Sequence, residues 1–502
     1  MPEAARQAQA QPQAGELTAN DFQNLMDGAS GARSDTAKSA VRNAVSVFAQ
    51  QVLEKTDLVV AEDVTKTIAA YIAEIDRKLT EQINLIIHND DFKALEGTWR
   101  GLAHLVKNTE TDEMLQIKVL NVSKKELTKT LKKYKGTEWD QSPLFKKVYE
   151  EEYGVFGGNP FGCFVGDYYW DHSAEDVQTL AGMAQICAAA HAPFMSAAGP
   201  SLLGMNSWQE LNVPRDIEKI FGQKEYLAWK SLRESEDSRY LGLTLPRFLS
   251  RLPYGAKTVP VEGFNFEEDV EGADHGKYVW SNAAFAMGAN ITRAFKLNGW
   301  CTQIRGRESG GTVADLPCHT FPTTDGDTDV KCPTEIAIPD RREAELGIKC
   351  GLIPLCYVKN STDAVFVGAQ SLQKPKVFQG RGANEANQSA QLSSRLPYLF
   401  ASCRFAHYLK CMVRDKVGRM MERAELQTFL QEWINNYVIE NPENAGEEKK
   451  AQRPLAGAQV EVKEVEGNPG YYSAVFRLRP HFQLEGVNVA LRLVGQLKQA
   501  GG

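Results

Sequence analysis

The sequence changes its hydrophobic period repeatedly between Met114 and Tyr357, and this switching limits the folds open to the chain. Runs with strand-like character alternate there with stretches whose apolar residues recur at helical spacing. This alternation predicts an α/β domain in which helices cover a mixed sheet. The strand-like runs are Leu115–Val122, Gly162–Tyr169, Pro193–Ala197, Tyr240–Leu245 and Gly351–Val358. The helical stretches are Lys124–Tyr134, Ala174–Ala190, Lys224–Glu234, Ala283–Leu297 and Asp340–Gly347.

The region before this domain reads as helical. Apolar residues at spacings of three and four from Asp35 to Ile86 predict two long amphipathic helices. A short amphipathic helix is predicted at Thr18–Asp27, between two stretches expected to be flexible. Such a helix has no core to join, so it either frays or docks on a partner. Its cap and its apolar face are formed by Thr18, Asp21, Phe22, Leu25 and Met26.

The region after the α/β domain is predicted to begin with helices and to end with strands. Within the α/β domain, we expect a long ordered loop at Gly299–Thr334. After the domain, we expect helices over Gln388–Tyr437, a polar break at Asn441–Leu455 and strands over Val460–Val494. A two-stranded hairpin is marginal in water, so strands Tyr471–Arg479 and Val487–Val494 need further partners. Either a neighbouring subunit supplies those strands, or the same chain does.

These patterns divide the chain into four parts. They are a tail with a short helix at 1–34, a helical partner-binding region at 35–110, an α/β core domain at 111–380 and a helical and β-strand domain at 381–502.

Composition narrows the class of protein. The chain has 57 Lys and Arg against 64 Asp and Glu, a net charge of −7, so no global field attracts nucleic acid or anionic lipid. It has no apolar run of about 18 residues and no secretory signal, so we expect a soluble cytoplasmic protein that does not insert into a membrane. Its nine scattered cysteines predict reduced thiols.

Motifs for metal or phosphate binding are incomplete in this sequence. Asp325–Asp329 begins like a calcium loop, but Val330 and Ile336 stand where such a loop needs Gly and Glu. Arg305–Gly311 is rich in Gly and Arg but lacks the Gly-Lys-Ser/Thr ending of a phosphate-binding loop. A zinc cluster would need shorter paired spacings than those of Cys318, His319, Cys332, Cys350 and Cys356.

We therefore predict no catalytic, cofactor-binding or metal-binding residues. The alternative is a cytoplasmic enzyme of unknown reaction that uses the Arg305–Gly311 loop or the region around Cys318.

Several ordered motifs identify a family resemblance. From about Ile83 to Val494, the chain resembles the large sheath subunit of the bacterial type VI secretion system, the TssC/VipB family. The motifs that carry the resemblance are Phe92–Gly101, Pro160–Tyr168, Gly310–Phe321, Pro333–Leu346 and Arg479–Phe482.

The resemblance implies a structural role. Members pair with a small sheath protein, TssB/VipA, and the pairs stack with further copies as a helical sheath around an inner tube of Hcp rings, next to a baseplate. Contraction of the sheath drives the tube and its spike out of the cell. In many systems an AAA+ ATPase, ClpV, recycles the contracted sheath by gripping an N-terminal helix of the large subunit.

Three groups of residues receive expected roles on this basis. The helix with Phe22 and Leu25 is the candidate for ATPase recognition, the alternative being an unused tail. Basic residues of the helix predicted around Leu396–Met421 are candidates to face the tube, the alternative being a solvated helix face: Arg404, Lys410, Arg414, Lys416 and Arg419. The candidates for an intersubunit strand are Tyr472, Phe476, Leu478, Val487, Val489, Leu491 and Leu493.

Overall fold

The computed structural model describes residues 34–37, 39–40, 43, 47, 64–213, 216–270, 275–380, 383–417, 419, 421–464, 472–481 and 483. The chain divides into two compact units, residues 1–79 and residues 80–502. The predicted helix Thr18–Asp27, with Thr18, Asp21, Phe22, Leu25 and Met26, lies outside the described residues. So do Val487, Val489, Leu491 and Leu493 of the predicted intersubunit strand.

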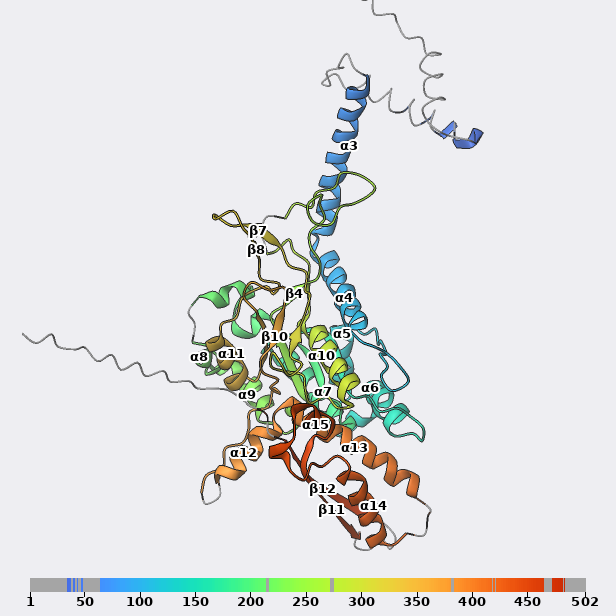
Figure 1. The fold of residues 1–502 in the computed structure, drawn as a ribbon, viewed down its shortest axis with the longest axis vertical. Coiled ribbons are helices and arrows are strands. Elements are labelled where there is room, and N and C mark those ends of the chain that lie inside the picture. The colour runs from blue at the N-terminus through green and yellow to red at the C-terminus, as the bar shows by residue number, and fades with distance from the viewer. Residues whose placement is uncertain are drawn as a thin grey trace, which may run out of the picture. The chain divides into compact units, whose positions relative to one another are not determined.

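Figure 1 shows the helices and strands of the described residues. The helices are α3 (Val64–Ile87), α4 (Asp90–Lys107), α5 (Lys124–Lys133), α6 (Pro143–Phe145), α7 (Ala174–Ala190), α8 (Ile217–Phe221), α9 (Leu227–Glu234), α10 (Ala283–Asn298), α11 (Asp340–Ala344), α12 (Ala383–Ser393), α13 (Leu396–Lys416), α14 (Arg423–Asn435) and α15 (Glu447–Gln452). The strands are β1 (Phe164–Trp170), β2 (Phe194–Ala198), β3 (Leu241–Leu245), β4 (Phe248–Leu249), β5 (Trp280–Ser281), β6 (Thr312–Val313), β7 (Thr320–Pro322), β8 (Thr328–Val330), β9 (Ile353–Tyr357), β10 (Ala364–Phe366), β11 (Leu455–Glu464) and β12 (Tyr472–Pro480).

A six-stranded sheet forms the centre of the second unit. Its strand order is β1-β2-β3-β9-β10-β6. The first four strands run parallel, whereas β10 is antiparallel to both β9 and β6. Helix α10 packs against β1, β2 and β3, and α7 connects β1 to β2 and contacts β2. The sheet is therefore mixed and covered by helices, which confirms the predicted α/β class.

The central strands are buried along their whole length. Every residue of β2 and β3 is buried, as expected for parallel strands with both faces covered. The polar Ser196 in β2 is fully buried, but its hydroxyl accepts a hydrogen bond from Trp170 Nε1 at 2.9 Å and donates to the Gly166 carbonyl at 2.8 Å. Burial of this hydroxyl therefore leaves no unmet hydrogen bond.

Local sequence signals fix the ends of the main helices. Ser123 and Glu126 form a reciprocal capping box at the start of α5, and Ser173 caps α7 by accepting from the Asp176 backbone N–H. Helix α10 begins at the N-cap Asn282 and ends at Gly299, whose φ of 75° lies in the left-handed region that glycine adopts readily.

The C-terminal part has a hydrophobic core of its own. Side chains of α13, α14 and β11 meet around Trp300, whose ring stacks on Phe405 with a centroid distance of 4.3 Å. Phe405, Leu430, Ile434 and Leu455 are fully buried in this core. The C-terminal strands therefore fold onto the helices that precede them in the sequence.

Three local predictions were wrong. Leu115–Val122 forms no strand, and Val119 and Leu120 are more than half exposed, because the segment has no strand beside it in the described structure. The predicted loop Gly299–Thr334 contains β6 and the hairpin β7–β8, whose strands are too short to show a period. The predicted polar break Asn441–Leu455 contains α15, and the strand after it begins at Leu455 rather than at Val460.

Two glycines let α4 lie directly on the core. A Cβ atom at Gly97 would overlap the Trp280 carbonyl oxygen, and a Cβ atom at Gly101 would overlap the Phe285 ring. Ser281 Oγ also donates to the Gly97 carbonyl at 2.7 Å. The motif Phe92–Gly101 is therefore a helix that approaches its neighbours as closely as the backbone allows.

We predict that Gly101→Ala destabilises the chain although alanine is the better helix former. Helix propensity alone favours Ala by about 1 kcal/mol, whereas overlap with the buried Phe285 ring costs about 1–3 kcal/mol. The melting temperature of the variant should fall. Gly162→Ala is the matched control, because an added Cβ there meets no atom within 4 Å. A melting temperature that rises in Gly101→Ala would contradict this packing.

Candidate assembly surfaces

Helix α4 is anchored by a buried ionic network. Arg251 lies between two carboxylates, with Nε 2.6 Å from Glu96 Oε1 and Nη1 2.6 Å from Glu268 Oε2. Arg100 also binds Glu96 at 2.7 Å and donates to the Tyr254 hydroxyl at 2.9 Å. The network joins α4 to the segment after β4, so it fixes the helix against the core.

The electrostatics of the network favour its charged form. Burial by itself would raise the pKa of Glu96, but hydrogen bonds from Arg251 and Arg100 outweigh burial, and the pKa lies below its usual value. Burial likewise opposes the charge of Arg251, yet the hydrogen bonds to Glu96 and Glu268 leave its pKa raised. The ion pairs therefore persist across the physiological pH range.

The opposite face of α4 carries a second apolar stripe. Its residues follow one another at spacings of three, four and seven, so they lie on one side of the helix. Trp99 is 63% exposed and Leu95 is 56% exposed, which is unusual for side chains of this size. The stripe consists of Phe92, Leu95, Trp99 and Val106, which are between 40% and 63% exposed, whereas Leu102, between the last two, is half-buried and packs against the cluster of Leu105, Phe285 and Ala289. Below, it is called the α4 stripe.

The first unit has exposed apolar side chains of its own. Ile72, Ile75 and Leu79 of α3 are each between 44% and 52% exposed, again at spacings of three and four. The amphipathic pattern of α3 is evident in the sequence. The α4 stripe is harder to predict, because the motif Phe92–Gly101 also contains the two glycines that face the core, and its only signal is the spacing of three and four.

The C-terminal hairpin has one closed edge. The backbone N–H groups of Val460 and Val462 in β11 donate to side-chain oxygens of Gln431 and Gln427, at 2.8 and 3.1 Å. The Gln431 amide also donates to the Ala458 carbonyl at 3.2 Å. Helix α14 thus pairs with the outer edge of β11 through its side chains and leaves no room for another strand there.

The outer edge of β12, unlike that of β11, has no pairing partner among the described residues. Val460 lies opposite Phe476, and Val462 lies opposite Ala474. Because residues opposite each other point their N–H and C=O groups either toward one another or both away, Phe476 and Ala474 direct theirs away from β11. Within the described ranges, β12 pairs only with β11. Its outer edge therefore presents backbone donors and acceptors to an incoming strand.

The structure adds a partner within the chain to the predicted strand Tyr471–Arg479. One edge of β12 pairs with β11, and the predicted strand Val487–Val494 lies outside the described residues. Tyr472, Phe476 and Leu478 are half-buried and pack against the C-terminal core. Their expected role between subunits stays a prediction.

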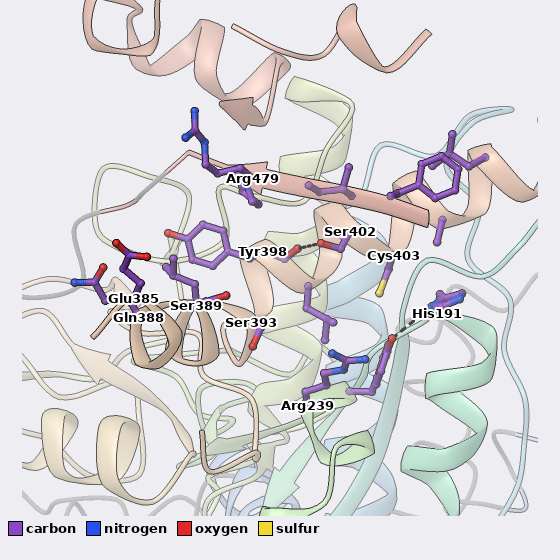
Figure 2. A pocket seen from close by; sticks show the side chains of 18 residues that line it. His191, Arg239, Glu385, Gln388, Ser389, Ser393, Tyr398, Ser402, Cys403 and Arg479 are labelled. Atoms are coloured by element: carbon purple, nitrogen blue, oxygen red, sulfur yellow. Dashed lines mark hydrogen bonds between the residues drawn. The ribbon is translucent and has the colours of Figure 1, made fainter. Parts of the chain in front are cut away.

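A cavity of about 600 Å³ lies beside β12. Figure 2 shows that residues of α12 and α13, such as Gln388, Ser393 and Ser402, surround it together with Arg479 of β12 and Arg239. Its lining includes residues of β12 but none of β11, so the cavity is on the side of the open edge.

The basic residues of α13 are engaged within the chain. Their cations lie over aromatic rings, and Lys410 also donates to the Tyr149 hydroxyl at 2.7 Å. Arg419, beyond the helix, is exposed. Contact with a tube stays a prediction for all five. The pairs and their distances from cation to ring centroid are Arg404 with Tyr408 at 4.7 Å, Lys410 with Tyr153 at 3.7 Å, Arg414 with Phe156 at 4.8 Å and Lys416 with Phe429 at 4.4 Å.

The Arg305–Gly311 loop is held by hydrogen bonds inside the chain. The Gly306 N–H donates to the Phe366 carbonyl at 2.8 Å, and the Gly311 N–H donates to the Gly306 carbonyl at 2.9 Å. A phosphate cradle needs such N–H groups free to point at the anion. These two N–H groups therefore hold the loop in place and do not point at an anion.

The cysteines considered for a zinc site lie in two different parts of the structure, and the aspartate motif lies in an exposed turn. Cys350 and Cys356 are buried in the main core, whereas Cys318 and Cys332 flank the β7–β8 hairpin. Asp325–Asp329 contains the exposed turn of that hairpin. Over the described residues, no group of three or more His, Cys, Asp or Glu side chains is placed to hold a metal ion.

Among the helices of the described residues, none combines the length and apolar character that crossing a membrane requires.

Two protein families match the sequence over most of its length. A family described as EvpB/VC_A0108, tail sheath N-terminal domain, matches residues 69–373, and a second described as EvpB/VC_A0108, tail sheath gpW/gp25-like domain, matches residues 385–497. The chain thus belongs to a family of tail-sheath proteins.

A curated relative makes the assignment more specific. The type VI secretion system sheath protein TssC1 of Pseudomonas aeruginosa strain PAO1 is 61% identical over 468 residues, which covers 93% of each chain. The chain belongs to this family of type VI secretion sheath proteins, as the resemblance to TssC/VipB had predicted.

Two solved structures show a more distant likeness. One is the baseplate of the anti-feeding prophage, with 10% identity, a TM-score of 0.34 and coverage of 63% of this chain and 66% of that chain. The other is a contracted sheath complex of an extracellular contractile injection system, with 10% identity, a TM-score of 0.32 and coverage of 62% and 68%.

A buried histidine predicts how the docking of α13 depends on pH. His407 is 2% exposed, and its Nε2 lies 2.9 Å from the Ala190 carbonyl oxygen. Burial lowers the pKa of His407 to about 4. The unfolded chain therefore takes up a proton below about pH 6.5 that the folded chain refuses, so stability is lost as pH falls from 6.5 toward 4.

We predict that replacing His407 removes part of the acid sensitivity. A shift from 6.5 to about 4 corresponds to about 3 kcal/mol. His407→Gln keeps a donor for the Ala190 carbonyl but has no proton to gain, so its melting temperature should fall less than that of the wild type between pH 7 and pH 4.5. Equal slopes in the two proteins would show that His407 does not titrate on unfolding.

Proposed function

We propose that this chain is a structural subunit of a contractile type VI secretion sheath. It pairs with the small sheath protein TssB/VipA, polymerises with further copies of itself around an Hcp tube next to a baseplate, and contracts to propel the tube and spike. The observation that carries this proposal is the α4 stripe, a large apolar surface on a helix that the Arg251 network fixes to the core.

The geometry of the stripe favours a helix as its partner. Apolar residues at alternating spacings of three and four form the seam along which two helices pack side by side. Exposed apolar patches of this kind usually mark a protein interface. The glycine face of α4 lies against the core, whereas Phe92, Leu95, Trp99 and Val106 are between 40% and 63% exposed in the described chain. We assign it to the small sheath protein.

The open edge of β12 supports strand addition between subunits. An added strand would take its affinity from backbone hydrogen bonds, and its alternate side chains would lie over the cavity beside β12. The segment 484–502, which contains Val487, Val489, Leu491 and Leu493, follows this hairpin in the sequence. We propose that Tyr472, Phe476 and Leu478 belong to this shared sheet.

The work of such a sheath comes from packing, without catalysis or a cofactor. An extended lattice that is less stable than the contracted one stores the free energy that contraction releases. In this proposal the Thr18–Asp27 helix is the handle for a recycling AAA+ ATPase such as ClpV, and the whole assembly operates in the cytoplasm.

We predict that Trp99→Asp prevents assembly with the small sheath protein. Co-expression of wild-type chain and partner should give hollow striated tubes by negative-stain electron microscopy. Trp99 is 63% exposed in the isolated chain, and burial of one such side chain contributes about 1.5–3 kcal/mol, so the variant should lose co-purification and tubes while remaining folded.

The matched control for this experiment is Ile348→Asp, which changes an equally exposed apolar residue, 64% exposed, outside α4. The control should form tubes. Normal tubes from Trp99→Asp, or irregular aggregates from the wild-type pair, would contradict the proposal.

We predict that Ala474→Pro blocks polymerisation but spares the pair with the small protein. Proline removes the outward N–H of the open β12 edge and none of the hydrogen bonds to β11, so the chain should fold. Ala474→Val is the matched control, because it keeps the N–H. Tubes of normal length from the proline variant would rule out strand addition at this edge.

A further inference from the structure

Two cysteines flank the base of the β7–β8 hairpin. The register pairs Thr320 with Val330 and Pro322 with Thr328. Two residues further from the turn, the same register places Cys318 opposite Cys332. The ladder continues in that direction, because the Lys331 N–H donates to the His319 carbonyl at 2.7 Å.

The hydrogen-bond pattern defines the kind of pair. His319 and Lys331 exchange a backbone hydrogen bond, and so do Thr323 and Asp327. Hydrogen-bonded and non-hydrogen-bonded pairs alternate along an antiparallel ladder. Cys318 and Cys332 therefore form a non-hydrogen-bonded pair, in which opposite side chains approach most closely.

This arrangement fits the geometry of a disulfide. Opposite residues in a non-hydrogen-bonded pair have Cα atoms about 4.5 Å apart, within the range of roughly 4.4–6.8 Å that a disulfide spans. The Cys318 thiol also contacts the carbonyl oxygen of Lys331, the residue bonded to Cys332. Both thiols are free and partly exposed.

We propose that Cys318 and Cys332 are a redox modification site at which a small-molecule disulfide, such as oxidised glutathione, produces a cross-strand disulfide. One cysteine thiolate attacks the reagent and forms a mixed disulfide while one glutathione thiolate leaves. The second cysteine thiolate attacks its partner's sulfur, and the second glutathione leaves. Two protein thiols are oxidised, one glutathione disulfide is reduced, and the two protons pass to the released thiolates.

The protein environment makes this exchange slow near neutral pH. Burial raises the pKa of Cys318 to about 11 and also raises the pKa of Cys332. Only the thiolate attacks a disulfide. The rate of oxidation should therefore rise about tenfold for each pH unit between pH 7 and pH 9. The site responds to sustained oxidation and closes the hairpin across its base.

The sequence provides a direct assay. Trypsin cleavage after Arg307, Lys331 and Arg341 places the two cysteines on separate peptides, 308–331 and 332–341. The full-length chain is incubated with oxidised glutathione at pH 8.5, blocked with an alkylating reagent at low pH, and digested without reductant. We expect mass spectrometry to find the two peptides joined, and dithiothreitol to separate them.

Two variants make the assay decisive. Cys332→Ser should accumulate a stable glutathione adduct on Cys318, because the resolving thiol is gone. Cys356→Ser is the matched control and should leave the joined peptides unchanged, since Cys356 is buried in the main core. Stable glutathione adducts on the wild-type pair, or free Cys318 and Cys332 after overnight oxidation at pH 9, would overturn the proposal.

Discussion

The placement of α4 depends on one buried cation. Arg251 is 7% exposed and satisfies two carboxylates, Glu96 from the helix and Glu268 from the segment that follows β4. Removal of Arg251 would leave the carboxylate of Glu268, whose side chain is 1% exposed, without this partner, which costs about 3–5 kcal/mol. The two glycines of α4 make this pairing possible, because they bring the helix backbone onto β5 and α10. The α4 stripe is a defined surface only because its supporting face is held in this way.

The two edges of the C-terminal hairpin show a similar division. Gln427 and Gln431 of α14 take up the outward backbone groups of β11, so only β12 offers an edge. Exposed edges invite unwanted pairing, and proteins usually close them. A chain that closes one edge with side chains and leaves the other open restricts strand addition to a single edge.

Elements with strong local signals could be predicted from the sequence. Changes in hydrophobic period along the sequence predicted strands at β1, β2, β3 and β9, and α7 was predicted at its observed bounds. Buried strands and capped helices can be predicted in this way because their patterns involve residues close together in the sequence. Leu115–Val122 was wrong because a strand exists only when another strand lies beside it. The Arg251 network could not be predicted, since its members lie 155 and 17 residues apart in the sequence, and the role of Gly101 depends on a ring in α10. The aromatic contacts of the α13 cations likewise come from tertiary packing.

The proposed surfaces differ in the kind of bond that they would form, and this difference suits a sheath that changes its packing. A contact along the α4 stripe consists of interlocking side chains, so it holds two subunits in one geometry. A strand added to β12 would be held by backbone hydrogen bonds along its length. Such a strand keeps its register while the bodies that it joins rotate. In the proposed lattice, the stripe would therefore define the rigid building block, and the shared strands would be the joints that survive contraction.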